Sequence, residues 1–453
     1  MSGAAVSDPV TIELGEERAA PVVARPPSPR RRRLAGLLVA ATAALLAGPP
    51  TPAPAFTEIR IAADSAEIID VDDDRLFATL IEGSQAETHD RTITAYRLPD
   101  GERLWQVTVS VAGGVPSLRR FGGVVVLQSQ DVEDGEITAI DDESGTILWR
   151  RPAAFFLGAP AAPGTQQPSA LIGTVGTDTG PLLQPDAVSV VDLRTGTQRW
   201  SYRLPQDATV EFAWNEELSL ATRMVTGLRS GRVEVRDLAT GQVTGAATLS
   251  GPVTSSSADA GSWLITHDGL VLVFAGADRH VVSAYGIDRL DHRWTARVDY
   301  AVGGLYGRTS CGELLCLGAG DSEVLAIERD TGQVRWSGSW EWVQRVGPAL
   351  LSRPAHGAGD ASSSMALLDP ATGRNRYDLG TWDMLSWFNL GDRPMLLRRD
   401  DSRQRAWFGV LDPATPGIRL LGTIPGAPAD CRGGRGAVVC RGMDGTIGIW
   451  RYR

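Results

Sequence analysis

The chain has 453 residues, of which 43% are apolar and 22% charged, and its mean hydropathy is −0.09. These values are typical of a soluble globular protein and exclude a polytopic membrane protein, a coiled coil and a wholly disordered chain. The 51 Gly and 27 Pro favour an all-β fold with many turns. The net charge of −10 excludes a nucleic-acid-binding body, which would be basic. All 44 basic residues are Arg, so Schiff-base chemistry and a P-loop lysine are also excluded.

The first 55 residues are predicted to precede the folded body, residues 56–453. Residues 1–33 lack apolar periodicity and end in four consecutive Arg, which predicts a disordered cytoplasmic tail with a basic end. Residues 34–55 begin with a charge-free run of fifteen residues, which as a helix would span about 22 Å of the ~30 Å hydrocarbon core. This segment is either a single-pass transmembrane anchor or the hydrophobic region of a signal peptide cleaved after Ala55. In both cases the body is expected outside the cytoplasm.

The four cysteines are close in pairs along the sequence, Cys311 with Cys316 and Cys431 with Cys440. Each pair flanks a Gly-containing turn between apolar runs, as in a strand hairpin. Opposed hairpin residues lie about 4.5–5.5 Å apart between Cα atoms, which a disulfide can span. Because an exported body is oxidised, we expect two local disulfides. The alternatives are the other pairings and four buried free thiols in a cytosolic protein.

One motif recurs along the whole body. It consists of apolar alternation, an acidic turn, Thr-Gly and a short strand that often contains Trp. The eight copies span residues 93–107, 137–151, 188–202, 233–247, 282–296, 324–338, 365–379 and 408–422. Where the turn glycine is clear, successive copies are separated by 44, 51, 45, 91 and 41 residues, and the spacing of 91 covers two units. Such a period predicts a repeat fold.

The motif has a mechanical interpretation. An Asp such as Asp192, Asp237 or Asp369 can accept hydrogen bonds from turn N–H groups, and the Gly four residues later takes the positive φ of a short hairpin. The repeated Trp side chains follow the turn at matching places and are expected to pack between neighbouring sheets. They are Trp105, Trp149, Trp200, Trp294 and Trp336.

Two more apolar runs precede each hairpin, so each unit holds four strands in about 45 residues, as in a propeller blade. A flat stack of blades would leave exposed edges, so the units are expected to close into a ring. The last unit lacks its outer strand, which residues 58–61 could supply. Eight hairpins plus this split unit would make nine, whereas about 50 residues per blade gives eight. We therefore predict an all-β propeller of about eight four-stranded blades, with seven and nine as the alternatives.

The repeat resembles that of the pyrroloquinoline-quinone (PQQ) type β-propeller. Residues 326–336 (AIERDTGQVRW) and 367–373 (LLDPATG) are close to the family form Ala-Leu-Asp-x-x-Thr-Gly-x-x-x-Trp. The resemblance covers residues 57–453. One branch, the quinoprotein dehydrogenases, binds PQQ and Ca²⁺ and often has a disulfide between adjacent cysteines, which this chain lacks. The other branch is similar to the outer membrane protein assembly factor BamB family, non-catalytic exported propellers that bind proteins, although the lipid-anchor Cys is missing here.

The sequence offers few candidates for chemistry. It contains no HExxH, GxSxG, GxxxxGK[ST] or CxxC motif, so we predict no catalytic, cofactor-binding or metal-ligating residue. Two acidic runs, residues 70–74 and 141–143, are expected to be solvated turn carboxylates, with Ca²⁺ binding as the alternative. Trp382, Trp387 and Phe388 lie outside the repeat's Trp position. They are the candidate surface for a partner protein or a glycan, with blade packing as the alternative.

These observations lead to three functional hypotheses. The first is a non-catalytic, monomeric protein-binding scaffold at the cell envelope, held by the N-terminal segment or exported after its cleavage, with no cofactor and no nucleic acid. The second is a PQQ-dependent quinoprotein oxidoreductase. The third is a membrane-anchored extracytoplasmic sensor. The sequence does not name the partner, because propellers bind through loop surfaces that no local motif encodes.

Overall fold

A computed structural model of the protein shows an all-β body. Contacts divide the chain into two units, Met1–Ala53 and Pro54–Arg453, and all described residues belong to the second. The predicted tail (1–33) and hydrophobic segment (34–55) therefore lie outside the described residues. In the part of the chain that is described, no helix is long and apolar enough to cross a membrane. The described residues are 57–61, 66–72, 74–80, 90–110, 117–129, 135–152, 155–160, 169–174, 185–214, 220–249, 263–275, 281–298, 309–319, 323–354, 364–385, 394–400, 402, 404–412, 417–426, 428–434, 436–442 and 444–452.

The strands form four-stranded antiparallel sheets, which we number as blades in chain order. Blades 1 to 3 contain β2 (Ala66–Asp72), β3 (Arg75–Leu80), β4 (Asp90–Arg97), β5 (Glu102–Ser110); β6 (Ser117–Phe121), β7 (Val124–Gln128), β8 (Glu136–Asp141), β9 (Ile147–Pro152); β10 (Phe155–Pro160), β11 (Ser169–Thr174), β12 (Ala187–Asp192) and β13 (Gln198–Arg203). Blades 4 to 6 contain β14 (Ala208–Trp214), β15 (Leu220–Leu228), β16 (Arg232–Asp237), β17 (Val243–Thr248); β18 (Trp263–His267), β19 (Leu270–Ala275), β20 (Val281–Gly286), β21 (His292–Arg297); β22 (Thr309–Cys311), β23 (Leu314–Ala319), β24 (Glu323–Glu328) and β25 (Val334–Gly338). Blades 7 to 9 contain β26 (Trp340–Val346), β27 (Ala349–Pro354), β28 (Met365–Leu368), β29 (Asn375–Gly380); β30 (Asp383–Met384), β31 (Met395–Asp400), β32 (Arg405–Asp412), β33 (Gly417–Pro425); β34 (Ala429–Gly434), β35 (Ala437–Arg441), β36 (Ile447–Arg451) and β1 (Thr57–Ile61).

The described residues thus form nine blades, and the predicted number of eight is wrong. Blades 3 and 4 join into one eight-stranded sheet through a two-residue parallel bridge between β10 and β15, but each keeps four strands of its own. A total of eight would require one weak unit, such as the fourth without its Trp or the eighth with Pro416 in its turn, to be merged or irregular. Both form complete blades, because the ladder of backbone hydrogen bonds does not need the Trp.

The turn chemistry of the repeat is as predicted. The carboxylate of Asp192 accepts a 2.9 Å hydrogen bond from the N–H of Thr195, and Asp237 and Asp369 accept equivalent bonds in their own turns. The glycines four residues after these Asp residues have φ between 65° and 72°, values that L side chains rarely adopt. The sequence therefore specifies each of these turns locally.

The repeated Trp side chains join each blade to the next. The indole N–H of Trp105 donates a 2.7 Å hydrogen bond to the carbonyl of Asp142 in the turn of blade 2, and its ring lies so close to Gly145 that a Cβ there would be 2.9 Å from it. The other four Trp residues make the same bond, at 2.6–2.9 Å, to Leu193, Leu238, Arg329 and Pro370. The turn Gly is thus required twice, for its φ and for the room it leaves.

Blade 4 departs from this pattern in two places that face each other. Gly245 stands where blades 1, 2, 3, 5 and 6 have Trp, four residues after the turn glycine Gly241. Leu290 stands at the glycine position of the blade 5 turn with φ of 55°, and its N–H bonds to the carbonyl of Gly286 as the turn glycines do in other blades. A Cβ on Gly245 would lie 2.9 Å from the carbonyl oxygen of Asp288 in that turn. At this junction the large side chain therefore belongs to the turn and not to the strand.

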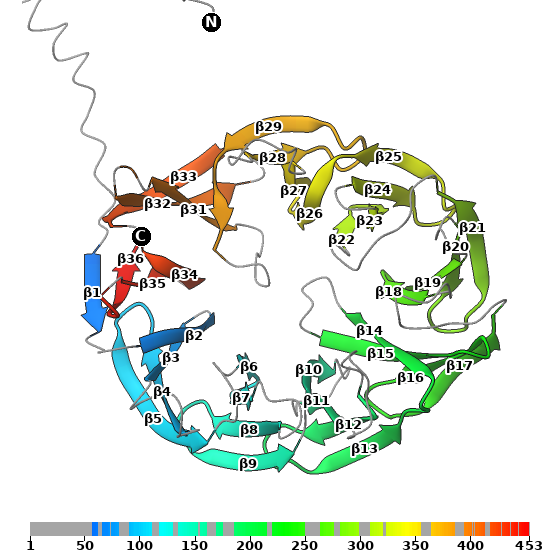
Figure 1. Ribbon diagram of the computed structural model, residues 1–453, viewed down its shortest axis with the longest axis horizontal. Helices are drawn as coiled ribbons and strands as arrows, with labels where there is room; N and C mark the ends of the chain where they lie inside the picture. The colour runs from blue at the N-terminus through cyan, green and yellow to red at the C-terminus, as the bar shows by residue number, and fades with distance from the viewer. Residues whose placement is uncertain are drawn as a thin grey trace, which may run out of the picture. The chain divides into compact units, whose positions relative to one another are not determined.

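The ring is closed by the first described strand, as predicted. β1 pairs with β36 from Thr57↔Arg451 to Ile61↔Ile447 and so completes blade 9 (Figure 1). Across the junction with blade 1, the Arg451 guanidinium donates to the carbonyl of Pro99 at 3.0 Å and to the carboxylate of Asp100 at 2.5 Å.

A hydrophobic cluster fills each of the nine blade interfaces among the described residues, including the interface between blades 9 and 1. Burial of these apolar faces is the main favourable contribution to folding, and it is distributed around the ring.

Both local disulfides are present as predicted. Cys431 and Cys440 are directly opposed across β34 and β35, with Cα atoms 4.1 Å apart. Cys311 and Cys316 link β22 to β23 on a diagonal, because Cys311 opposes Leu314 in the register, and their Cα atoms are 5.7 Å apart. All four side chains are buried.

Candidate partner-binding site on blade 8

A cavity among the described residues lies on the face of blade 8 that is turned toward blade 7. Alternation along the strands places Leu396, Leu411 and Ile418 on this face, where they pack into the cluster shared with blade 7. Farther along the same face the side chains are Arg398 and Trp407, which oppose each other across β31 and β32. Here the face is no longer fully buried.

A glycine makes the cavity possible. Gly409 on β32 carries no side chain, and a Cβ there would collide with Ile418 and lie 3.5 Å from the ring of Trp382. The indole of Trp382, which precedes β30, therefore lies over the backbone of β32 and faces the cavity.

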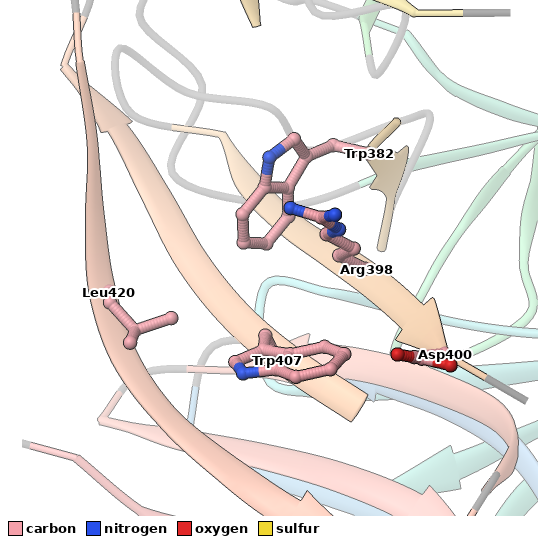
Figure 2. A pocket seen from close by; sticks show the side chains of 5 residues that line it. All are labelled: Trp382, Arg398, Asp400, Trp407 and Leu420. Atoms are coloured by element: carbon pink, nitrogen blue, oxygen red, sulfur yellow. The ribbon is translucent and has the colours of Figure 1, made fainter. Parts of the chain in front are cut away.

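The cavity has a volume of about 350 Å³ and is lined by Trp382, Arg398, Asp400, Trp407 and Leu420. Figure 2 shows the two indoles on either side of Arg398, with Leu420 and Asp400 at opposite ends. The guanidinium carbon of Arg398 lies 5.9 Å from the centroid of the Trp407 ring, within reach of a cation–π interaction. Leu420 belongs to the outer strand β33 and is 48% exposed. The cavity is apolar with charges at its margin, which is the composition of a recognition site.

The surroundings of the cavity are basic, although the protein is acidic. Residues 1–55 carry six Arg and four carboxylates, so the rest of the chain has a net charge of −12. The cavity's face of β31 and β32 nevertheless carries two exposed Arg, Arg398 and Arg405, and one half-buried Asp, Asp400, whereas Arg399 and Arg419 alternate onto the face toward blade 9. Exposed guanidinium groups beside an aromatic cavity favour an anionic partner.

The structure describes one of the three residues of the sequence-based candidate surface, and that residue, Trp382, also packs against the cluster shared with blade 7. Trp382 lines the cavity, whereas Trp387 and Phe388 lie outside the described residues. Trp407 and Leu420 were not predicted as site residues. The available signal was that Trp407 lies before the turn of its unit, whereas the packing Trp residues lie after it.

The two acidic runs are solvated only in part, since Glu143 is exposed and Asp142 is buried. Asp142 is only 2% exposed, and the guanidinium of Arg120 bridges it, at 2.8 Å, to Asp74 of blade 1, at 2.9 Å. Arg75 adds a 2.7 Å ion pair with Asp74. Burial lowers the pKa of Arg120, but attraction to Asp142 and Asp74 outweighs it and the pKa is raised. Among the described residues, no group of His, Cys, Asp and Glu could hold a metal ion. These carboxylates form an ion network between blades 1 and 2.

Asp70, on strand β2, has a perturbed carboxyl group. Burial raises its pKa to about 6, and Asp72 adds to the shift. The N–H of Val71, which donates a 2.9 Å hydrogen bond to this carboxylate, and the more distant Arg432 and Arg119 act in the opposite direction. Ionisable groups with shifted pKa values occur in structural ion networks as well as in active sites, so the raised pKa of Asp70 alone identifies no reaction.

A closed ring of four-stranded blades, with Trp side chains docked on Asp-x-x-Thr-Gly turns, defines a PQQ-like β-propeller. The chain belongs to the family described as outer membrane protein assembly factor BamB, which matches residues 89–338, more than half of its length. This confirms the resemblance found in the repeat. No curated protein is significantly similar to the chain in sequence.

Three solved structures are similar to the chain. The computationally designed Ika8 protein is 17% identical, with 75% of this chain and 98% of that chain covered and a TM-score of 0.44. BamB from Moraxella catarrhalis is 16% identical, with 74% and 96% covered and a TM-score of 0.42. Sqt1 from Saccharomyces cerevisiae is 11% identical, with 88% and 99% covered and a TM-score of 0.44. TM-scores below 0.5 do not establish a common arrangement of the blades.

Proposed function

We propose that this propeller is a non-catalytic scaffold at the cell envelope that binds a partner protein through blade 8. The observation that carries the proposal is the cavity between Trp382 and Trp407, which opens beside the exposed Leu420 in a chain of the BamB family. Half-buried aromatic side chains beside an exposed Arg have the composition of protein-binding hot spots. The name of the family refers to assembly of outer membrane proteins, and we extend to this chain only the role of a binding scaffold.

Membership of this family and the predicted export segment at residues 34–55 support the envelope location. A propeller suits a scaffold because its rigid blades hold surface side chains in fixed positions, and a pre-organised surface loses less conformational entropy on binding.

Site-specific photo-crosslinking in cells that express the full-length chain tests the proposal. A photoreactive amino acid at position 420 is compared with one at position 243, because Leu420 and Val243 are similarly exposed, at 48% and 46%, on outer strands of different blades. We expect one dominant crosslinked protein from position 420, found in the envelope fraction, and none from position 243. Equal capture at both positions, or none at either, would contradict the proposal.

A further inference from the structure

We propose that the blade 8 cavity binds an acidic protein segment that inserts one aromatic or large aliphatic side chain between Trp382 and Trp407. This inference rests on the proposed function and adds the chemistry of the partner to it.

The apolar part of the recognition follows from the lining. Two indoles and the exposed Leu420 present apolar surface to solvent, and removal of such surface from water favours binding. A ring that enters the space can also stack against the indoles in an offset or edge-to-face arrangement. The volume of about 350 Å³ lies at the lower end of the range for ligand sites, which suits one side chain better than a large cofactor.

The charge preference follows from the two exposed Arg residues on the cavity's own face, which outnumber the one Asp there. Arg398 lies in the cavity, and Arg405 stands on the same face, directly opposite Asp400 across the two strands. Carboxylates of a bound segment would form charge-assisted hydrogen bonds with these guanidinium groups at the rim. A basic segment would meet like charge, which costs affinity and disfavours the wrong partner.

A glycan is the other ligand that aromatic rings and polar margins can bind. A neutral oligosaccharide gains nothing from the excess of Arg over Asp on the cavity's face. The charge of the site therefore favours the acidic peptide, and a neutral oligosaccharide serves as the competing probe.

Fluorescence anisotropy with labelled peptides tests the inference on the full-length protein. The probe is a Glu-rich peptide of about nine residues with one central Phe, the length of an extended recognition segment. Its two matched controls replace Phe by Ala or every Glu by Lys. We expect the probe to bind at least tenfold more tightly than either control. Its binding should weaken at high salt, because salt screens ion pairs at the rim of a site.

Variants localise the binding. Leu420→Glu should weaken probe binding at least tenfold, whereas Val243→Glu, an equally exposed change on blade 4, should leave it unchanged. Arg398→Glu should weaken binding of the Glu-rich peptide and strengthen binding of the peptide in which every Glu is replaced by Lys. Both exposed substitutions should preserve the circular dichroism spectrum, so that loss of binding is not loss of fold.

Three results would overturn the inference: no preference for the Glu peptide, equal effects of the two exposed variants, or displacement of the probe by a neutral oligosaccharide. If any of these occurs while position 420 still captures a protein in cells, the scaffold function stands and only the partner chemistry falls. If position 420 captures nothing as well, both fall.

Discussion

At the residue scale, Gly245 and Leu290 show that one large side chain, from either of two neighbouring blades, fills the space between them. In five junctions a Trp lies over a turn Gly, and between blades 4 and 5 the large residue belongs to the turn. We expect Gly245→Trp to destabilise the protein by about 1–3 kcal/mol, because the indole would overlap the turn at Asp288 and Leu290. Adding Leu290→Gly should recover most of this loss by recreating the usual arrangement. Equilibrium urea unfolding of both single variants and the double variant measures the coupling, and strictly additive effects would contradict the shared volume.

The Asp70 carboxyl makes stability depend on pH. Because its pKa is raised to about 6 in the folded protein, the protonated form is favoured there, and stability should fall as pH rises from about 4 to about 6 and then level off. Asp70→Asn removes the charge and keeps an acceptor for the N–H of Val71.

We expect this Asp70→Asn variant to be more stable than the parent at pH 7, by up to about 3 kcal/mol, and equally stable at pH 4. Urea unfolding at the two pH values checks this, with Glu143→Gln on an exposed turn as the control. A stabilisation that is equal at both pH values would exclude the ionisation as its cause.

At the element scale, the two disulfides fasten inner hairpins of blades 6 and 9. The chain-entropy estimate for the short loops they close, with sequence separations of 5 and 9, is about 2 and 3 kcal/mol. Replacing Cys431 and Cys440 by Ala should therefore lower the free energy of unfolding by about 3 kcal/mol, and the same change at Cys311 and Cys316 by slightly less. Urea unfolding with and without reductant measures both effects. An unchanged midpoint for the parent protein in reductant would show that the thiols are not paired in solution.

The elements differ in how far they could be predicted. Turn carboxylates, turn glycines and the local cystines were predictable, because each depends on residues within a few positions of one another. The site on blade 8 was not, because it combines the register of three strands with the missing side chain of Gly409. The burial of Asp142 was missed for a related reason, since its partner Arg120 and the bridged Asp74 come from distant parts of the sequence.

At the scale of the whole molecule, the number of blades depends on closure and not on average length. Nine interfaces are filled in turn around the ring, and β1 provides the last strand. Division of the body into blades of about 50 residues gave eight, because one weak unit was then not counted as a blade of its own. The turn spacings of 44, 45 and 41 residues already favoured shorter blades. The same ring geometry is compatible with catalytic and with binding proteins, since a fold does not determine a function.

The proposed scaffold function requires that this PQQ-like ring binds a partner protein and does not work as a quinoprotein. The most direct test is calorimetric titration of the full-length protein with PQQ and Ca²⁺. We predict no heat of binding at about 100 μM PQQ, which would limit any affinity to weaker than the micromolar range. Micromolar or tighter binding would contradict the scaffold function and would favour an oxidoreductase with an alcohol or sugar substrate.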